Sequence, residues 1–217
     1  MSFRICLALT AALLSGCASV DHRPLTAEAS AQLQGKRIVS TQYPMPDFAA
    51  FTAGKAAFAI AGAGAMIVEG NGIVRDNGIP DPALAISKAL TERLLAARKV
   101  ALVRSQAVAP SDEVSTLVAT YTGADYLLDV KTLGWMFNYY PTDWAHYKVT
   151  YNARLRLIDA SSQKVVAETM CQTVQGDDAN PPTKDQLLAN RAALLKSYLD
   201  KGAAACVDVL ARDVLQL

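Results

Sequence analysis

The sequence predicts an α+β fold, a two-layer sandwich with a mixed sheet, a C-terminal antiparallel meander, helices packed on one face and a long C-terminal helix. Three observations predict it. Strand and helix patterns are interspersed before residue 126, three strand-like segments follow, and helical periodicity runs from residue 183 towards the C-terminus. Hydrophobic residues make up 52% of the 217 residues, which is enough for a packed core and argues against disorder.

The first half of the chain combines short strands with helices. Alanine recurs at every fourth residue from Ala49 to Ala65, which indicates a helix that should end at Gly70–Gly72. Asp81 before Pro82 is typical of a helix start. In chain order, the predicted elements are a strand over 37–43, a helix over 48–68, a helix over 82–98, a buried strand over 100–103 and a helix over 112–121.

The second half reads as a meander followed by one helix. Strands are predicted over 126–140, 145–158 and 165–174. The middle strand alternates between an apolar set and a polar set of side chains, and we expect the polar face to meet water or a sheet rim. Thr183 can cap a terminal helix that runs to about residue 214, and helical periodicity continues across Gly202, so the helix is either continuous or gently broken.

The N-terminus has the layout of an export signal. Arg4 precedes an uncharged run from Ile5 to Leu14, which is far shorter than the roughly 20 residues of a membrane-spanning helix. Leu14-Ser15-Gly16-Cys17 follows and resembles the lipobox of bacterial lipoproteins. The resemblance implies that residues 1–16 are removed and that Cys17 carries acyl chains such as palmitate, which anchor the protein to a membrane.

This resemblance also implies a domain organisation and a location. Residues 17–35 would form the lipidated cysteine and a polar tether, and residues 36–217 a single periplasmic domain. Ala18 after the cysteine favours the outer membrane, because an aspartate there would favour retention in the inner membrane. In its order of elements the domain resembles the periplasmic α/β domain of curli-secretion lipoproteins and of lipoprotein activators of peptidoglycan synthases.

The cysteines, the charged residues and the histidines indicate a disulfide and argue against a nucleic-acid surface and a metal site. Cys6 leaves with the signal and Cys17 is lipidated, so Cys171 and Cys206 are expected to pair in the oxidising periplasm, with two buried free thiols as the alternative. Without Arg4, the chain has 20 basic and 20 acidic residues, so it has no excess of positive charge that would indicate binding to nucleic acid. With only two histidines in the chain, no metal site is expected.

No motif for catalysis or cofactor binding stands out. The sequence contains no Gly-x-Ser-x-Gly motif of serine hydrolases, no His-Glu-x-x-His motif of zinc proteases and no Gly-Lys-Ser/Thr motif of phosphate-binding loops. His146 lies near Asp143, and Asp177 and Asp178 lie in a loop, but a hairpin histidine and a solvated turn explain them better. We therefore expect a protein that is not an enzyme and has no cofactor.

Two surfaces are candidates for contacts. Tyr139, Tyr140 and Trp144 flank the Pro141 turn, where they either pack in the core or present a binding surface for a protein, a glycan or a membrane. The stripe of small side chains is the second candidate, either as a helix pressed closely on the sheet or as a self-association or membrane contact. Its members are Ala53, Ala57, Ala61 and Ala65.

Together these features predict a membrane-anchored lipoprotein that acts as a non-catalytic accessory or structural subunit of a cell-envelope assembly. Its partners would be an envelope protein or further copies of itself. A lipoprotein that binds a glycan or a lipidic ligand is the alternative, and a periplasmic hydrolase of unfamiliar type is the third possibility.

Overall fold

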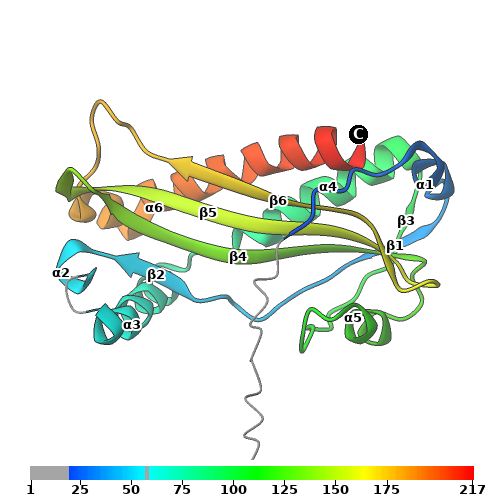
Figure 1. Ribbon diagram of the computed structural model, residues 1–217, viewed down its shortest axis with the longest axis horizontal. Coiled ribbons are helices and arrows are strands. Elements are labelled where there is room, and N and C mark those ends of the chain that lie inside the picture. The colour runs from blue at the N-terminus through cyan, green and yellow to red at the C-terminus, as the bar shows by residue number, and fades with distance from the viewer. Residues whose placement is uncertain (1–19, 57–58) are drawn as a thin grey trace, which may run out of the picture.

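A mixed six-stranded sheet runs along the length of the molecule (Figure 1). The computed structural model describes residues 20–56 and 59–217, so the predicted signal, Cys17 and Ala57 lie outside the described residues. The strands are β1 (Arg37–Ser40), β2 (Phe48–Phe51), β3 (Ala101–Leu102), β4 (Tyr126–Tyr140), β5 (Asp143–Asp159) and β6 (Lys164–Gln175). Their order is β3-β1-β4-β5-β6, and β2 pairs with β4 beyond the end of β1.

The long strands β4, β5 and β6 form the predicted antiparallel meander, which is confirmed. β1 and β2 run parallel to β4, and the chain between them contains Pro44 and Pro46. Odd-numbered side chains of β5 from Tyr147 to Leu157 are buried against the helices, as alternation predicts. The mixed character of the sheet thus arises at β4, which has parallel neighbours on one side and an antiparallel one on the other.

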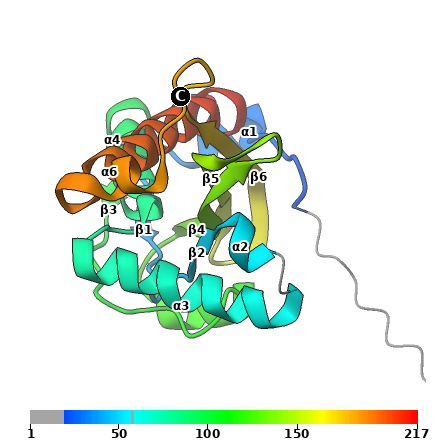
Figure 2. The same ribbon diagram turned by 90° about the vertical axis from the view of Figure 1, so that its left-hand side faces the viewer.

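Helices α4 and α6 cover one face of this sheet (Figures 1 and 2), so the two-layer architecture is confirmed. α5 is the exception, because its Leu117 packs on the other face against Leu127 and Ile158. The helices are α1 (Ala27–Gln32), α2 (Ala53–Ala56), α3 (Ala59–Asn77), α4 (Pro82–Arg98), α5 (Val114–Thr120) and α6 (Lys184–Val209), which continues as the π-helical turn η1 (Leu210–Leu215).

The N-cap of α4 is the one that the sequence predicts. The Asp81 side chain accepts a hydrogen bond of 2.9 Å from the backbone N–H of Ala83, and Pro82 stands at the first helical position. The helix ends at Lys99, whose φ of 50° is left-handed. Ile86, Leu90 and Leu94 on its inner face are fully buried.

The terminal helix α6 begins at the predicted cap, where Thr183 and Gln186 form a capping box. The helix continues across Gly202, and its irregular backbone lies instead at residues 189–192, with left-handed dihedral angles at the last three. Gly202 allows close packing, because a Cβ there would lie 2.7 Å from Oγ1 of Thr173 on β6.

A disulfide between Cys171 and Cys206 joins β6 to α6, as predicted, with the two Cα atoms 5.6 Å apart. Both residues are buried in the core between the sheet and the helix. The bond closes a loop of 35 residues and is expected to contribute about 2–4 kcal/mol, mainly by restricting the unfolded chain.

The prediction of one helix over 48–68 is wrong at both ends. Phe48–Phe51 forms strand β2, which pairs with Trp135–Asn138 of β4. The Phe48 ring lies edge-on to Trp135, with ring centroids 5.1 Å apart. The helix α3 runs on through Gly70 to Asn77, because Gly70 packs against the backbone of Phe48 and Val74 is buried in the core.

The folded part also begins earlier than residue 36, so the predicted polar tether is wrong from Arg23 onward. Arg23 exchanges two backbone hydrogen bonds, of 2.7 and 2.8 Å, with Glu168 of β6. Leu25 and Leu33 are fully buried, which anchors the segment that contains α1. The expectation of a buried strand over 100–103 is also wrong, because β3 is an exposed edge strand.

Candidate functional site

Only one of the three predicted hairpin aromatics is exposed. Trp144 is 68% exposed, and its indole Nε1 donates a hydrogen bond of 3.0 Å to the carbonyl oxygen of Pro141, which holds the ring over the turn. Trp144 is therefore the side chain at this tip that is available to a partner.

Tyr139 and Tyr140 are both engaged within the molecule. The Tyr139 ring stacks on Phe51 of β2, with centroids 5.8 Å apart and planes 11° apart. The Tyr140 hydroxyl donates to Asp178 at 2.9 Å, and Lys148 lies 5.5 Å from the ring centroid. Burial, together with the Asp178 carboxylate, raises the pKa of Tyr140 to about 12. The three aromatics thus do not form one exposed cluster.

His146 and the acidic loop serve local structure. Nδ1 of His146 lies 2.6 Å from the Asp143 carboxylate, and the backbone of His146 bridges to Thr183 at the start of α6. Asp177 accepts hydrogen bonds from two backbone N–H groups that follow it in the same loop. Among residues 20–56 and 59–217, no group of three or more His, Cys, Asp or Glu side chains could hold a metal ion.

Of the small-residue stripe, neither of the two side chains that the structure describes is buried. Ala53 on α2 is half-buried and Ala65 on α3 is exposed, whereas Ala61 lies in α3 with a side chain outside the description. The side of α3 that faces β2 and α2 carries Gly62, Met66, Gly70 and Val74. Ala65 shares the outer side of this helix with Val68, which is 76% exposed.

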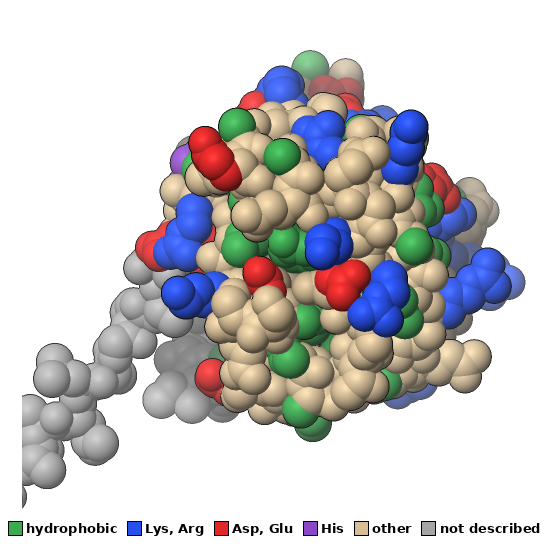
Figure 3. All heavy atoms as spheres, turned by 90° about the vertical axis from the view of Figure 1, so that its right-hand side faces the viewer, with side chains coloured by type: hydrophobic (Ala, Val, Ile, Leu, Met, Phe, Trp, Pro, Cys, Tyr) green, Lys and Arg blue, Asp and Glu red, His purple; other side chains and the backbone are tan. Residues whose placement is uncertain are grey.

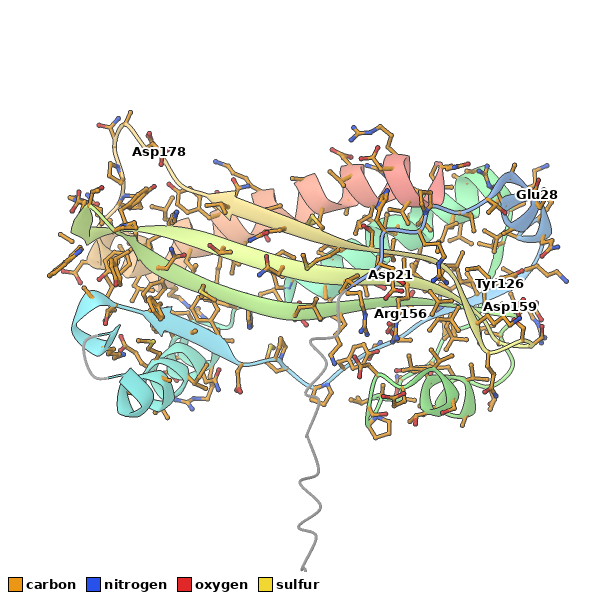
Figure 4. The ribbon with its side chains drawn as sticks, in the orientation of Figure 1. Asp21, Glu28, Tyr126, Arg156, Asp159 and Asp178 are labelled. Carbon is orange, nitrogen blue, oxygen red and sulfur yellow. A yellow bond between two sulfur atoms is a disulfide. The ribbon has the colours of Figure 1, made fainter. Side chains whose placement is uncertain are left out.

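A cluster of charged and hydroxyl groups that the sequence analysis missed lies on the sheet face that α5 covers. Asp129 of β4 is fully buried at its centre, opposite Arg156 of β5 in the register. Figure 4 labels Arg156 on this sheet. We call this group the Asp129 cluster; its members are Thr41, Tyr43, Asp112, Asp129, Arg154 and Arg156.

Every oxygen of the Asp129 carboxylate has a donor. Oδ1 accepts hydrogen bonds from Thr41 at 2.8 Å and Tyr43 at 2.5 Å, and Oδ2 accepts one from Nε of Arg156 at 2.8 Å. Burial and the neighbouring carboxylate raise the pKa of Tyr43, so the phenol remains a donor. A buried charge is tolerated when it is paired and hydrogen-bonded in this way.

Asp112, which precedes α5, is the second carboxylate of the Asp129 cluster. It accepts hydrogen bonds of 2.9 Å from both Lys131 and Arg154, while its carbonyl oxygen accepts one of 2.7 Å from Arg156. Burial opposes ionisation, but the hydrogen bonds from Lys131 and Arg154 prevail and lower the pKa of Asp112 to about 2. The cluster thus ties the segment before α5 to β4 and β5.

The expectation that the polar face of β5 meets water is wrong for Arg154 and Arg156. Their side chains are 13% and 8% exposed, because Asp129 and Asp112 neutralise them and α5 lies beside them. A sequence signal for this existed. Pairing the segments 126–140 and 145–158 as a hairpin brings Asp129 and Arg156 to opposing positions on one sheet face.

Two cavities of the described structure are lined by charged side chains. One of about 230 Å³ lies beside the Asp129 cluster, between Lys131, Asp112 and Tyr43, whose polar atoms are already hydrogen-bonded to neighbours. Another, of about 490 Å³, opens at the end of the molecule away from the hairpin, lined by Asp125 and Asp159. Acidic and basic side chains are interspersed on that end (Figure 3), so it presents no surface of one charge.

The pH dependence of stability should reveal the Asp112 contribution. Because the pKa of Asp112 is lower in the folded state than its usual 3.8, its ionised form stabilises the fold above about pH 4. That stability is lost as the pH falls from about 4 through about 2. After allowance for solvent screening of this partly exposed group, Asp112→Asn should cost about 1 kcal/mol at pH 7.

Chemical denaturation of both proteins between pH 7 and pH 2 measures this effect. The difference between them should shrink towards zero at the acid end. Asp76→Asn, which removes a carboxylate from an exposed pair with Arg75, controls for the change in net charge. A difference that stays constant down to pH 2 would contradict the assignment.

Comparison with known proteins adds distant similarities. No family model matches the chain, and no curated protein matches it. Among solved structures, the hypothetical protein CT253 of Chlamydia trachomatis has 12% identity and a TM-score of 0.43, covering 82% of this chain and 95% of its own. Protein XCC0632 of Xanthomonas campestris, of family DUF330, has 12% identity and a TM-score of 0.42, covering 90% of this chain and 93% of its own. Lipoprotein GNA1162 of Neisseria meningitidis has 13% identity and a TM-score of 0.35, covering 82% of this chain and 99% of its own.

Proposed function

We propose that the mature chain is a lipoprotein of the outer membrane that faces the periplasm and acts as a non-catalytic accessory subunit of an envelope assembly. The observation that carries this proposal is Leu14-Ser15-Gly16-Cys17 directly after an uncharged export-type run. The disulfide between Cys171 and Cys206 supports it, because such bonds persist in oxidising compartments outside the cytoplasm. Among the described residues, no helix is long and apolar enough to cross a membrane.

Lipidation of Cys17 is the first test of this function. Cys17→Ala should abolish labelling of the protein by an alkyne fatty-acid analogue in growing cells, because the proposed acyl chains are attached to the thiol and the amino group of this cysteine. Cys6→Ala, which changes a cysteine inside the predicted signal, should leave labelling unchanged. Equal labelling of the Cys17→Ala variant and the unaltered protein would contradict the lipoprotein assignment.

Trp144 is the proposed centre of a protein contact. Large exposed aromatics supply much apolar contact area for little loss of conformational freedom, which is why they dominate binding energies. Trp144→Ser should change the free energy of unfolding by less than about 0.5 kcal/mol, since the side chain is 68% exposed. It should also reduce the recovery of crosslinked partners, or of further copies of this chain, from solubilised membranes.

Tyr139→Ser is the matched control for this variant. It removes the stacking on Phe51, so it should cost about 2 kcal/mol of stability while leaving partner recovery at moderate temperature unchanged. If Trp144→Ser leaves every crosslinked partner in place, or if it destabilises the fold as much as Tyr139→Ser, the contact is not at this tip.

A lipidic or glycan ligand is the second candidate function, and one groove favours it. The groove has a volume of about 550 Å³ and lies between α4 and the segment after β3. Leu84, Leu95 and Leu102 line it, together with Ser87, whose buried hydroxyl has no hydrogen-bond partner among the described residues. Native mass spectrometry of protein purified from membranes would detect a bound molecule, and Leu95→Glu in the groove should remove it.

A further inference from the structure

In the part of the chain that the structure describes, one face of the sheet carries no helix over its middle. On the side away from α4 and α6, no helix of the described residues lies over the central parts of β4, β5 and β6 (Figures 1 and 2). Thr150 of β5 lies between Met136 of β4 and Val174 of β6 in the register, so these strands present one continuous surface. We call it the open face; its members are Leu133, Met136, Thr150, Met170, Gln172 and Val174.

Four of the six side chains of the open face are apolar and two are polar, and Arg154 lies opposite Met170 at one end of it. Leu133 is 43% exposed, Met170 is 47% exposed and Val174 is 52% exposed. At the end nearest α5, the neighbouring Arg154 is neutralised by ion pairs with Asp112 and Asp129. Apolar side chains gathered on one exposed surface are typical of an interaction site.

The chain enters the domain beside this face. Arg23 pairs antiparallel with Glu168 on β6, so the residues that precede Arg23 approach from the direction of Met170. Cys17 is six residues before Arg23. Whatever the conformation between them, the two residues cannot be more than about 20 Å apart, since each residue spans at most about 3.3–3.6 Å.

We propose that the open face rests on the surface of the bilayer that holds the acyl chains of Cys17. This inference rests on the proposed function, because it requires lipidation of Cys17. Along β6, Met170 is about 7 Å and Val174 about 20 Å from Glu168, and β4 lies about 10 Å across the sheet from β6. The open face is therefore within the reach of the anchor.

Other exposed apolar side chains lie farther from the anchor at Cys17 or on the opposite face of the sheet. Trp144 is more than ten residues along β5 from Arg156, which pairs with Glu168, so it lies about 40 Å from the point where the chain enters. The exposed Leu84 belongs to α4 on the opposite face of the sheet. A short tether also raises the effective concentration of the membrane near the open face, so that a weak apolar contact suffices.

Fluorescent labels on single introduced cysteines test this orientation. The acylated protein would carry Leu133→Cys or Val174→Cys on the open face, or Ala97→Cys as the control, because Ala97 is exposed on α4 and does not line the groove beside that helix. Cys171 and Cys206 do not react, because they are joined in the disulfide. Each protein is reconstituted on vesicles of phosphatidylethanolamine and phosphatidylglycerol, and quenching by a nitroxide-labelled lipid is compared with quenching by iodide from water.

The expected result is several-fold stronger quenching by the nitroxide lipid at positions 133 and 174 than at position 97, with the reverse order for iodide. Equal quenching at all three positions in protein that floats with the vesicles would overturn the membrane contact and leave the lipoprotein assignment intact. Protein that fails to float would overturn both. Shielding from iodide at 133 and 174 without nitroxide quenching would mean that a protein covers the open face, which also overturns the proposal.

Discussion

Asp129→Ala is expected to lower the free energy of unfolding by about 3–5 kcal/mol, which is the cost of removing one partner from a buried ion pair. The carboxylate is fully buried, and its loss leaves the Arg156 guanidinium without its counter-charge and the hydroxyls of Thr41 and Tyr43 without an acceptor. Urea denaturation monitored by tryptophan fluorescence measures the change.

Asp208→Ala is the control for the loss of an ion pair as such. Asp208 lies 2.6 Å from Arg93, but its side chain is 66% exposed, so the pair should contribute less than about 1 kcal/mol. Asp129→Asn keeps the shape of the side chain and its hydrogen bonding but not its charge. Its loss in free energy of unfolding should therefore lie between those of Asp129→Ala and Asp208→Ala. A loss for Asp129→Ala no larger than for Asp208→Ala would refute the structural role of the Asp129 cluster.

Gly70→Ala is expected to destabilise the protein by about 3 kcal/mol or more, at the upper end of the range for overpacked sites. A Cβ at this position would lie 1.9 Å from the carbonyl oxygen of Phe48 and 3.0 Å from the backbone nitrogen of Ala50. Both are backbone atoms of β2, so neither can move aside as a flexible side chain would. The helix α3 would have to withdraw from the strand, exposing the buried Met66 and Val74.

Gly64→Ala tests the same substitution on the same helix where no atom lies within 4 Å of the new Cβ. Because alanine favours the helix over glycine, this variant should gain up to about 1 kcal/mol. Thermal melting of both variants gives the comparison. If both variants shift the melting temperature upward, α3 does not pack on β2 at Gly70.

Much of the fold follows from local patterns. Asp81 and Thr183 cap helices where the sequence predicts them, because a cap needs only a few adjacent residues. The three long strands of the meander appear because alternation over ten or more residues is a strong signal. The pairing of Cys171 and Cys206 follows once an exported chain is assumed, since the other two cysteines have roles in the precursor.

The candidate surfaces were predicted less completely. The hairpin was located correctly, but Phe51, far away in the sequence, takes Tyr139 out of the exposed set. Alanine spacing indicated a helix without indicating which of its sides would be buried, and it is Gly70 that packs on β2, whereas Ala65 is exposed. Neither result can be derived from spacing alone, because each depends on which neighbour the element meets.

The sequence by itself determined the elements with strong periodicity, their caps, the disulfide partners and the hypothesis of a lipidated Cys17. Only the tertiary structure decided that Phe48–Phe51 is a strand, that Asp129 and Arg156 are buried together, and that Arg23 joins the edge of β6. The physical reason is the separation in the sequence of the residues that make each contact. Periodicity and capping depend on residues a few positions apart, whereas the pairing of β2 with β4 and the burial of Asp129 depend on contacts between residues that are distant in the chain.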